Sequence, residues 1–81
     1  MKMTEQQALD IINETLRKTL KDRSVTAKID TDLAGESILD SLDGMVFLLE
    51  LSEKTNKTFP EKDLVELGFF RVRKLVEHIT S

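Results

Sequence analysis

Asp40 and Ser41 are the residues of this chain whose types and spacing best fit a chemical role, within the stretch ILDSLDGM at residues 38–45. Aspartate and serine are strong helix-starting residues, and a long apolar run follows them at once. A serine at the first position of a helix lies beside backbone N–H groups that have no intrahelical acceptor, where an attached phosphate would be well placed. The pair is therefore either only a helix cap or a place where another enzyme attaches a group to the serine hydroxyl.

Catalysis by the chain's own side chains has little support in the sequence. A serine nucleophile needs a general base within hydrogen-bond reach. His78, near the end of the chain, is the one histidine, and there is no Cys, Trp or Tyr. We expect His78 to be a surface residue that suits a helix C-terminus. A serine hydrolase that uses Ser41 and His78 is a third and minor hypothesis.

The acidic residues Asp30, Asp32 and Glu36 have the spacing nearest to that of a metal site. They do not form a calcium loop, because the mid-loop glycine and the terminal glutamate of that pattern are missing. Gly35 and Gly44 belong to no glycine-rich loop that could hold a phosphate. We therefore predict no metal ligand in this chain.

The helices that would position Ser41 follow from the apolar spacing. Thr4 and Gln7 form a capping-box pattern ahead of apolar residues at helical spacing, which predicts a first helix over about residues 4–20. Residues 22–39 have no sustained period, so we expect a long loop whose apolar residues pack into the core. Long loops in small domains are uncommon and often functional. The apolar residues of this loop are Val25, Ile29, Leu33, Ile38 and Leu39.

Three further helices complete the predicted fold. The second begins at Asp40 or Ser41 and runs to about Thr55, and Pro60 fits the first turn of a short third helix over residues 60–67. A last helix has apolar residues at helical spacing, namely Val72, Leu75, Val76 and Ile79. The sequence thus predicts an all-α fold, a small four-helix bundle with three longer helices and one short one.

The composition is that of one small domain covering residues 1–81. The chain has 81 residues, a net charge of −3 and no cysteine, so no disulfide or thiolate metal site can stabilise it. Between Lys28 and Lys54 there are seven acidic residues and no Lys or Arg. Such a surface repels phosphate backbones and attracts basic protein patches, so we predict protein partners and no nucleic acid. A solvated acidic surface without a partner is the alternative.

The longest apolar run, Met45 to Leu49, is far too short to span a membrane. The stretch MKMTEQQALD at the N-terminus lacks the apolar segment of a signal peptide. We expect a cytoplasmic protein without membrane insertion, and a monomer.

The sequence around Ser41 resembles the acyl and peptidyl carrier proteins, which bear 4′-phosphopantetheine on the serine of a D-S-L motif. LDSLDGMVFLLELSEKTNKTFPEKDL is similar to the family's second helix, the turn after it and the start of its third helix. GFFRVRKLVEHI is similar to the closing segment, and the resemblance covers about residues 4–80. The stretch SILDSL is closer to the specialised stand-alone carriers, including the D-alanine carrier type, than to the fatty-acid synthesis protein.

The resemblance implies a four-helix bundle of acyl-carrier type and a carrier function without catalysis. Ser41 would be the attachment site of 4′-phosphopantetheine from coenzyme A, and Asp40 would help a phosphopantetheinyl transferase to engage. The cargo, acyl or aminoacyl, would be held as a thioester and presented to a loading ligase and to downstream synthase or transferase enzymes. Such carriers serve fatty acid or secondary metabolite biosynthesis. The sequence does not distinguish fatty acyl, aminoacyl and polyketide cargo.

The predicted second helix has two apolar stripes. Phe47, Leu48 and Leu51 would pack against the first and last helices, and the other stripe would stay partly exposed as a docking face for partners. The alternative is that both stripes are buried because the helix is central in the bundle. The expected partner-docking residues are Leu42, Asp43, Met45, Val46, Leu49, Glu50 and Glu53. A helical protein-interaction module that uses the same stripe without a prosthetic group is the alternative function.

Overall fold

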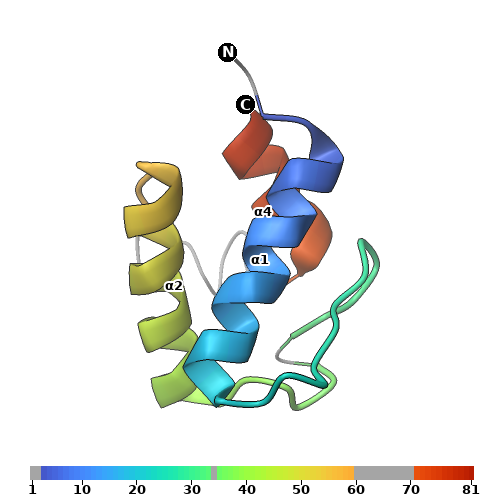
Figure 1. The fold of residues 1–81 in the computed structure, drawn as a ribbon, viewed down its shortest axis with the longest axis vertical. Coiled ribbons are helices and arrows are strands. Elements are labelled where there is room, and N and C mark those ends of the chain that lie inside the picture. The colour runs from blue at the N-terminus through green and yellow to red at the C-terminus, as the bar shows by residue number, and fades with distance from the viewer. Residues whose placement is uncertain (1–2, 34, 60–70) are drawn as a thin grey trace.

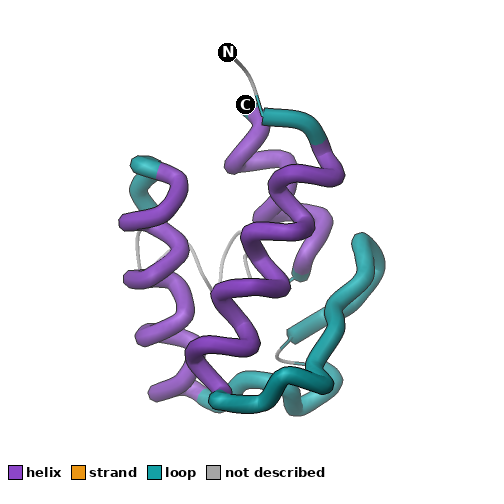
Figure 2. The backbone as a smooth tube through the Cα atoms, viewed as in Figure 1, coloured by secondary structure: helices purple, strands orange, loops and turns teal. Residues whose placement is uncertain are grey.

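The computed structural model describes residues 3–33, 35–59 and 71–81, apart from the side chain of Ser41. These ranges contain three α-helices and no strand: α1 (Glu5–Leu20), α2 (Ser41–Thr55) and α4 (Val72–Thr80) (Figures 1 and 2). The all-α class predicted from the sequence is therefore confirmed for this part of the chain. The short helix predicted over residues 60–67, which would complete a four-helix bundle, lies outside the described residues.

The capping residues set where α1 and α2 begin. Thr4 Oγ1 accepts the Gln7 N–H at 3.1 Å, and Gln7 Oε1 accepts the Thr4 N–H at 2.9 Å, so the predicted capping box is formed. Asp40 is the N-cap of α2. Lys21 and Asn56 end the two helices in the left-handed conformation, with φ of 54° and 56°. The predicted bounds of both helices are confirmed to within a residue.

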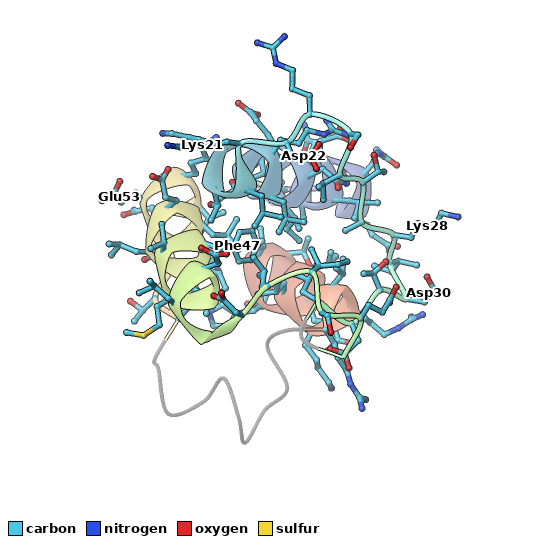
Figure 3. All side chains as sticks on the ribbon, turned by 90° about the horizontal axis from the view of Figure 1, so that it is seen from below. Lys21, Asp22, Lys28, Asp30, Phe47 and Glu53 are labelled. Atoms are coloured by element: carbon cyan, nitrogen blue, oxygen red, sulfur yellow. The ribbon has the colours of Figure 1, made fainter. Side chains whose placement is uncertain are left out.

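The three helices share one apolar core. α1 packs against both α2 and α4, and Phe47 points from α2 into the space that the three helices enclose (Figure 3). The predicted stripe on α4 is buried as expected. The buried apolar residues of the helices are Ala8, Ile12, Leu16, Phe47, Leu48, Leu51, Val72, Leu75, Val76 and Ile79.

The connection between α1 and α2 lies along the side of α1 that faces away from α2 (Figure 2). Its apolar residues pack on the core as predicted: Leu33 and Leu39 are buried, and Val25, Ile29 and Ile38 are partly buried against it.

Backbone hydrogen bonds also tie this loop to α4. The Thr31 carbonyl accepts the Val72 N–H at 2.9 Å, and Asp32 forms an isolated β-bridge with Arg71. The loop is thus part of the folded structure at its far end as well as at α1.

Asn13 is the buried polar residue of α1 that pairs with the loop, and Arg17 adds hydrogen bonds to the Val25 carbonyl at 2.9 Å and to Thr26 Oγ1 at 3.1 Å. The Asn13 side chain is buried, and its amide pairs with both backbone groups of Ala27. Asn13 Nδ2 donates to the Ala27 carbonyl at 3.0 Å, and the Ala27 N–H donates to Asn13 Oδ1 at 2.5 Å. A buried backbone group needs a partner, so this pairing is what permits the loop to lie so close to the helix.

We predict that Asn13→Ala destabilises the fold by about 2–3 kcal/mol, because it leaves both backbone groups of buried Ala27 without their partner. Urea unfolding followed by circular dichroism measures this. Asp10→Ala, which removes an exposed polar side chain from the same helix, is the control and should cost less than about 0.5 kcal/mol. Equal losses in the free energy of unfolding would show that the pairing of Asn13 with Ala27 stabilises the fold no more than an exposed polar side chain does.

Within the part of the chain that the structure describes, the buried hydroxyl of Thr19 has no hydrogen-bond partner. Burial of an unpaired hydroxyl costs free energy, and valine has nearly the same shape without the oxygen. We therefore predict that Thr19→Val stabilises the protein by about 1 kcal/mol, measured by urea unfolding. Thr15→Val is the matched control, because Thr15 Oγ1 donates to the Ile11 carbonyl at 2.7 Å, and it should bring no such gain.

Candidate functional site

The candidate site is the N-terminal end of α2, where the sequence predicts either a cap or an attachment point. Asp40 Oδ1 accepts the Asp43 N–H at 2.7 Å, and the Asp40 carbonyl accepts the Gly44 N–H at 2.8 Å. Asp40 therefore supplies the cap, and Ser41 is the first helical residue. The backbone N–H groups of Ser41 and Leu42 precede the first residue that can donate within the helix, so they have no intrahelical acceptor.

This end of α2 lies at the surface of the protein. Asp40 is exposed, and 72% of Leu42 is accessible to solvent. The side chain of Ser41 lies outside what the structure describes, so its role as an attachment point stays a prediction. The residues on both sides of it, Asp40 and Leu42, are exposed.

The second apolar stripe of α2 is exposed. Leu42, Met45, Val46 and Leu49 are 72%, 48%, 43% and 65% exposed, whereas Phe47, Leu48 and Leu51 are buried. The alternative in which both stripes are buried is therefore wrong for this structure. Four large apolar side chains in adjacent turns form a patch that is unusual for a solvated helix face, and such patches mark interaction sites. We call these four residues the α2 stripe.

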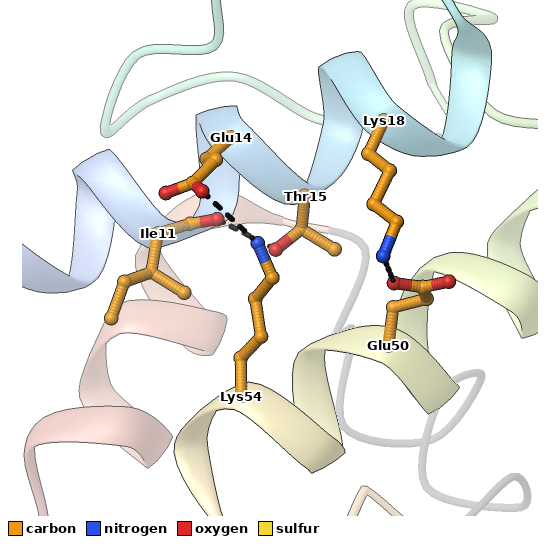
Figure 4. Close-up of polar contacts among 6 residues, drawn as sticks. All are labelled: Ile11, Glu14, Thr15, Lys18, Glu50 and Lys54. Carbon is orange, nitrogen blue, oxygen red and sulfur yellow. Dashed lines mark hydrogen bonds and ion pairs between the residues drawn. The ribbon is translucent and has the colours of Figure 1, made fainter.

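Two ion pairs join α2 to α1 along one side of the α2 stripe (Figure 4). Lys18 Nζ lies 3.0 Å from Glu50 Oε2, and Lys54 Nζ lies 3.4 Å from Glu14 Oε1. Glu50, expected among the docking residues, is therefore engaged within the chain. Sequence reasoning missed both pairs, because the register of two antiparallel helices cannot be read from either helix alone.

The other expected docking acids are placed differently. Asp43 is half-buried in the first turn of α2, and Glu53 is exposed and points away from the core (Figure 3). Neither forms an ion pair with any residue in the described ranges. Among the described residues, Asp43 in the first turn and Glu53 in the last turns of α2 are therefore acids without a cation partner.

His78 lies at the opposite end of α2 from Ser41. Its Nε2 donates to the Thr58 carbonyl at 2.8 Å, and its ring centroid is 4.8 Å from that of Phe59. Residues 58 and 59 follow the C-terminal end of α2, whose length is about 20 Å. The distance is too large for His78 to act as a base at Ser41 in this structure. His78 is also half-buried, where we expected a surface residue.

The acidic residues of the loop serve its turns. Asp32 Oδ1 accepts the Gly35 N–H at 2.9 Å, and Glu36 Oε2 accepts the Asp32 N–H at 3.0 Å. Asp32 Oδ2 also lies 4.0 Å from Arg71 Nε, which makes a weak ion pair. Across the described ranges, no three His, Cys, Asp or Glu side chains gather as metal ligands. Asp32 and Glu36, two of the three acids whose spacing suggested a metal site, thus accept backbone hydrogen bonds within the loop.

Comparisons of this chain with protein family models, with curated proteins and with solved structures found no match. The resemblance to carrier proteins therefore depends on the D-S-L motif and on the spacing of the segments after it. Among the helices of the described residues, none is both long enough and apolar enough to cross a membrane.

We predict that Asp40→Ala destabilises the protein by about 1 kcal/mol, because the Asp43 N–H loses its capping acceptor. Asp40→Ser keeps a capping oxygen and should restore most of that stability, and thermal or urea unfolding distinguishes the two. If Asp40→Ser were as unstable as Asp40→Ala, the contribution of Asp40 would not be capping.

Proposed function

We propose that this chain is a carrier protein that holds an acyl or aminoacyl group as a thioester on 4′-phosphopantetheine attached to Ser41. The observation that carries the proposal is a juxtaposition: the D-S-L motif opens α2 at the surface, and the exposed α2 stripe begins at the next residue, Leu42. An attachment point beside a docking patch is what presentation of a tethered group to another enzyme requires.

The first turn of α2 fits the phosphate of such a group. The backbone N–H groups of residues 41 and 42 have no intrahelical acceptor, and the N-terminal end of a helix carries partial positive charge. Asp40 already caps the helix through the Asp43 N–H, so capping does not depend on Ser41. When bound, the prosthetic group would supply the thiol that a chain without cysteine lacks.

The chain's own residues would supply presentation and recognition. A phosphopantetheinyl transferase would modify Ser41 with Asp40 as the acidic neighbour, and a loading ligase and downstream enzymes would dock on the α2 stripe. Docking has to be weak for a carrier to move between enzymes, and a small patch suits weak docking. Met45 contributes a flexible apolar contact that adapts to different partners.

The proposal also covers the complete fold of the chain and its location in the cell. A short third helix over residues 60–67 would complete a four-helix bundle of acyl-carrier type, and the protein would act as a monomer in the cytoplasm. The separation between His78 and the N-terminal end of α2 disfavours the serine hydrolase hypothesis, because nucleophile and base have to be within hydrogen-bond reach.

The exposed stripe also fits a second function. A helical interaction module would use Leu42, Met45, Val46 and Leu49 to bind one partner and would never carry a prosthetic group. In that case Ser41→Ala would leave partner binding and biological function intact, which separates the two functions.

The carrier proposal predicts that the purified chain gains the mass of one phosphopantetheine group when incubated with coenzyme A, Mg²⁺ and a broad-specificity phosphopantetheinyl transferase. Intact-protein mass spectrometry measures the gain. Ser41→Ala should abolish it, because the hydroxyl that forms the phosphodiester is gone.

Ser37→Ala is the matched control, since Ser37 is an exposed serine four residues earlier and its loss should leave modification unchanged. Failure of several transferases to modify the wild-type chain, with circular dichroism showing it folded, would contradict the proposal.

A further inference from the structure

The segment that leads into Asp40 is a turn closed by backbone hydrogen bonds. The Leu33 carbonyl accepts two backbone N–H groups, that of Ile38 at 2.9 Å and that of Leu39 at 3.0 Å. Leu33 and Leu39 are also buried in the core. Leu39 is therefore held by its backbone and by its side chain, and Asp40 and Ser41 follow it directly.

Asp32 closes the other end of this turn. Its Oδ1 accepts the Gly35 N–H at 2.9 Å. Its carbonyl accepts the Glu36 N–H at 2.9 Å, and its own N–H donates to Glu36 Oε2 at 3.0 Å. An aspartate side chain that accepts a nearby backbone N–H holds a turn closed. We call residues 32, 33 and 35–39 the Asp32 turn.

The Asp32 turn is anchored on α4. Thr31, one residue before it, is buried, and its carbonyl accepts the Val72 N–H at 2.9 Å. Asp32 itself forms the β-bridge with Arg71. The turn thus connects a fixed point at the start of α4 to the buried Leu39, so a shift of the turn breaks at least one of these contacts.

We infer that Asp32 is a positioning residue for the modification of Ser41 and that it acts through the Asp32 turn. This inference rests on the proposed function and concerns the same site. Misalignment of a reacting group by about 1 Å can slow a reaction by about a hundredfold. The chain contributes to alignment by holding the backbone ahead of Ser41 in one conformation, and the Asp32 turn is the part of the loop that holds it.

The transfer reaction defines what has to be aligned. Ser41 Oγ forms a bond to the phosphorus that carries the pantetheine arm, the pyrophosphate bond of coenzyme A breaks, and adenosine bisphosphate leaves. The hydroxyl proton passes to a base of the transferase. Asp32 lies nine residues before Ser41 and acts through the backbone between them, so its loss should lower kcat and leave KM for the chain nearly unchanged.

Transfer kinetics with coenzyme A and a phosphopantetheinyl transferase test the inference. Asp32→Ala should lower kcat by about five- to twentyfold and change KM by less than about twofold, because docking is kept and alignment is lost. Asp32→Asn loses the same charge but keeps an oxygen that accepts the Gly35 N–H, so its kcat should lie within about twofold of the wild-type value. Asp30→Ala is the matched charge control, since it removes an exposed carboxylate of the same loop, and it should behave as the wild type does.

Gly35→Ala is a second variant that acts on the same contact. A Cβ at Gly35 would lie 2.6 Å from Asp32 Oδ2 and 2.8 Å from Asp32 Cγ, so the carboxylate has to move and its bond with the residue 35 N–H is lost. Gly35→Ala should therefore lower kcat as Asp32→Ala does. In the Asp32→Ala background it should lower kcat by less than about a further twofold, because the atoms that it displaces are already gone.

Hydrogen exchange of the unmodified chain, measured by NMR, separates loss of alignment from general loss of stability. The Leu39 N–H should exchange about tenfold faster in Asp32→Ala than in the wild type, a larger increase than that of amides in the middle of α1. Faster exchange at Leu39 with an unchanged kcat would overturn the inference. It would also be overturned by equal losses of kcat in Asp32→Asn and Asp32→Ala, or by effects of Gly35→Ala and Asp32→Ala that multiply in the double variant.

The two proposals fail in different ways. If the wild-type chain gains no mass, the carrier function fails and the inference fails with it. If the wild type is modified and Asp32→Ala is modified at the same rate, only the inference fails.

Discussion

Burial of Phe47 is the constraint on which the arrangement of α2 depends. Phe47 is completely buried, and Leu51 one turn later is buried with it. Each such side chain contributes about 1.5–3 kcal/mol when removed from water, so rotation of the helix away from this contact is strongly disfavoured. With this face fixed on the core, helical geometry places Leu42 and Leu49 in solvent. The exposed patch is thus a consequence of the core contact.

Polar contacts determine two features that the apolar core does not: the register of α1 and α2, and the position of the loop on α1. The ion pairs of Glu50 and Glu14 with lysines across the α1–α2 seam are largely exposed, so they contribute little to stability and more to the register of the two helices. Asn13 has the opposite character, because its pairing with Ala27 is buried and holds a long loop against α1.

The helices and the stripe could be predicted from the sequence because their signals are local. Thr4 with Gln7 marks the start of α1, and the spacing of Phe47, Leu48 and Leu51 separates the core face of α2 from its second stripe. Contacts between segments could not be predicted. The pairing of Asn13 with Ala27 joins residues 14 positions apart, and neither residue type predicts it. The contact of His78 with Thr58 likewise depends on tertiary packing.

The acids at the ends of the α2 stripe also affect how one copy of the chain meets another. Two α2 helices packed parallel over their stripes would bring Glu53 of one chain beside Glu53 of the other. Like charges repel, so this pairing is disfavoured. An antiparallel pair that matches Leu42 with Leu49 would place Asp43 opposite Leu48 and would bring no such carboxylates together. The exposed acid therefore distinguishes between the two ways in which a second copy could cover the stripe.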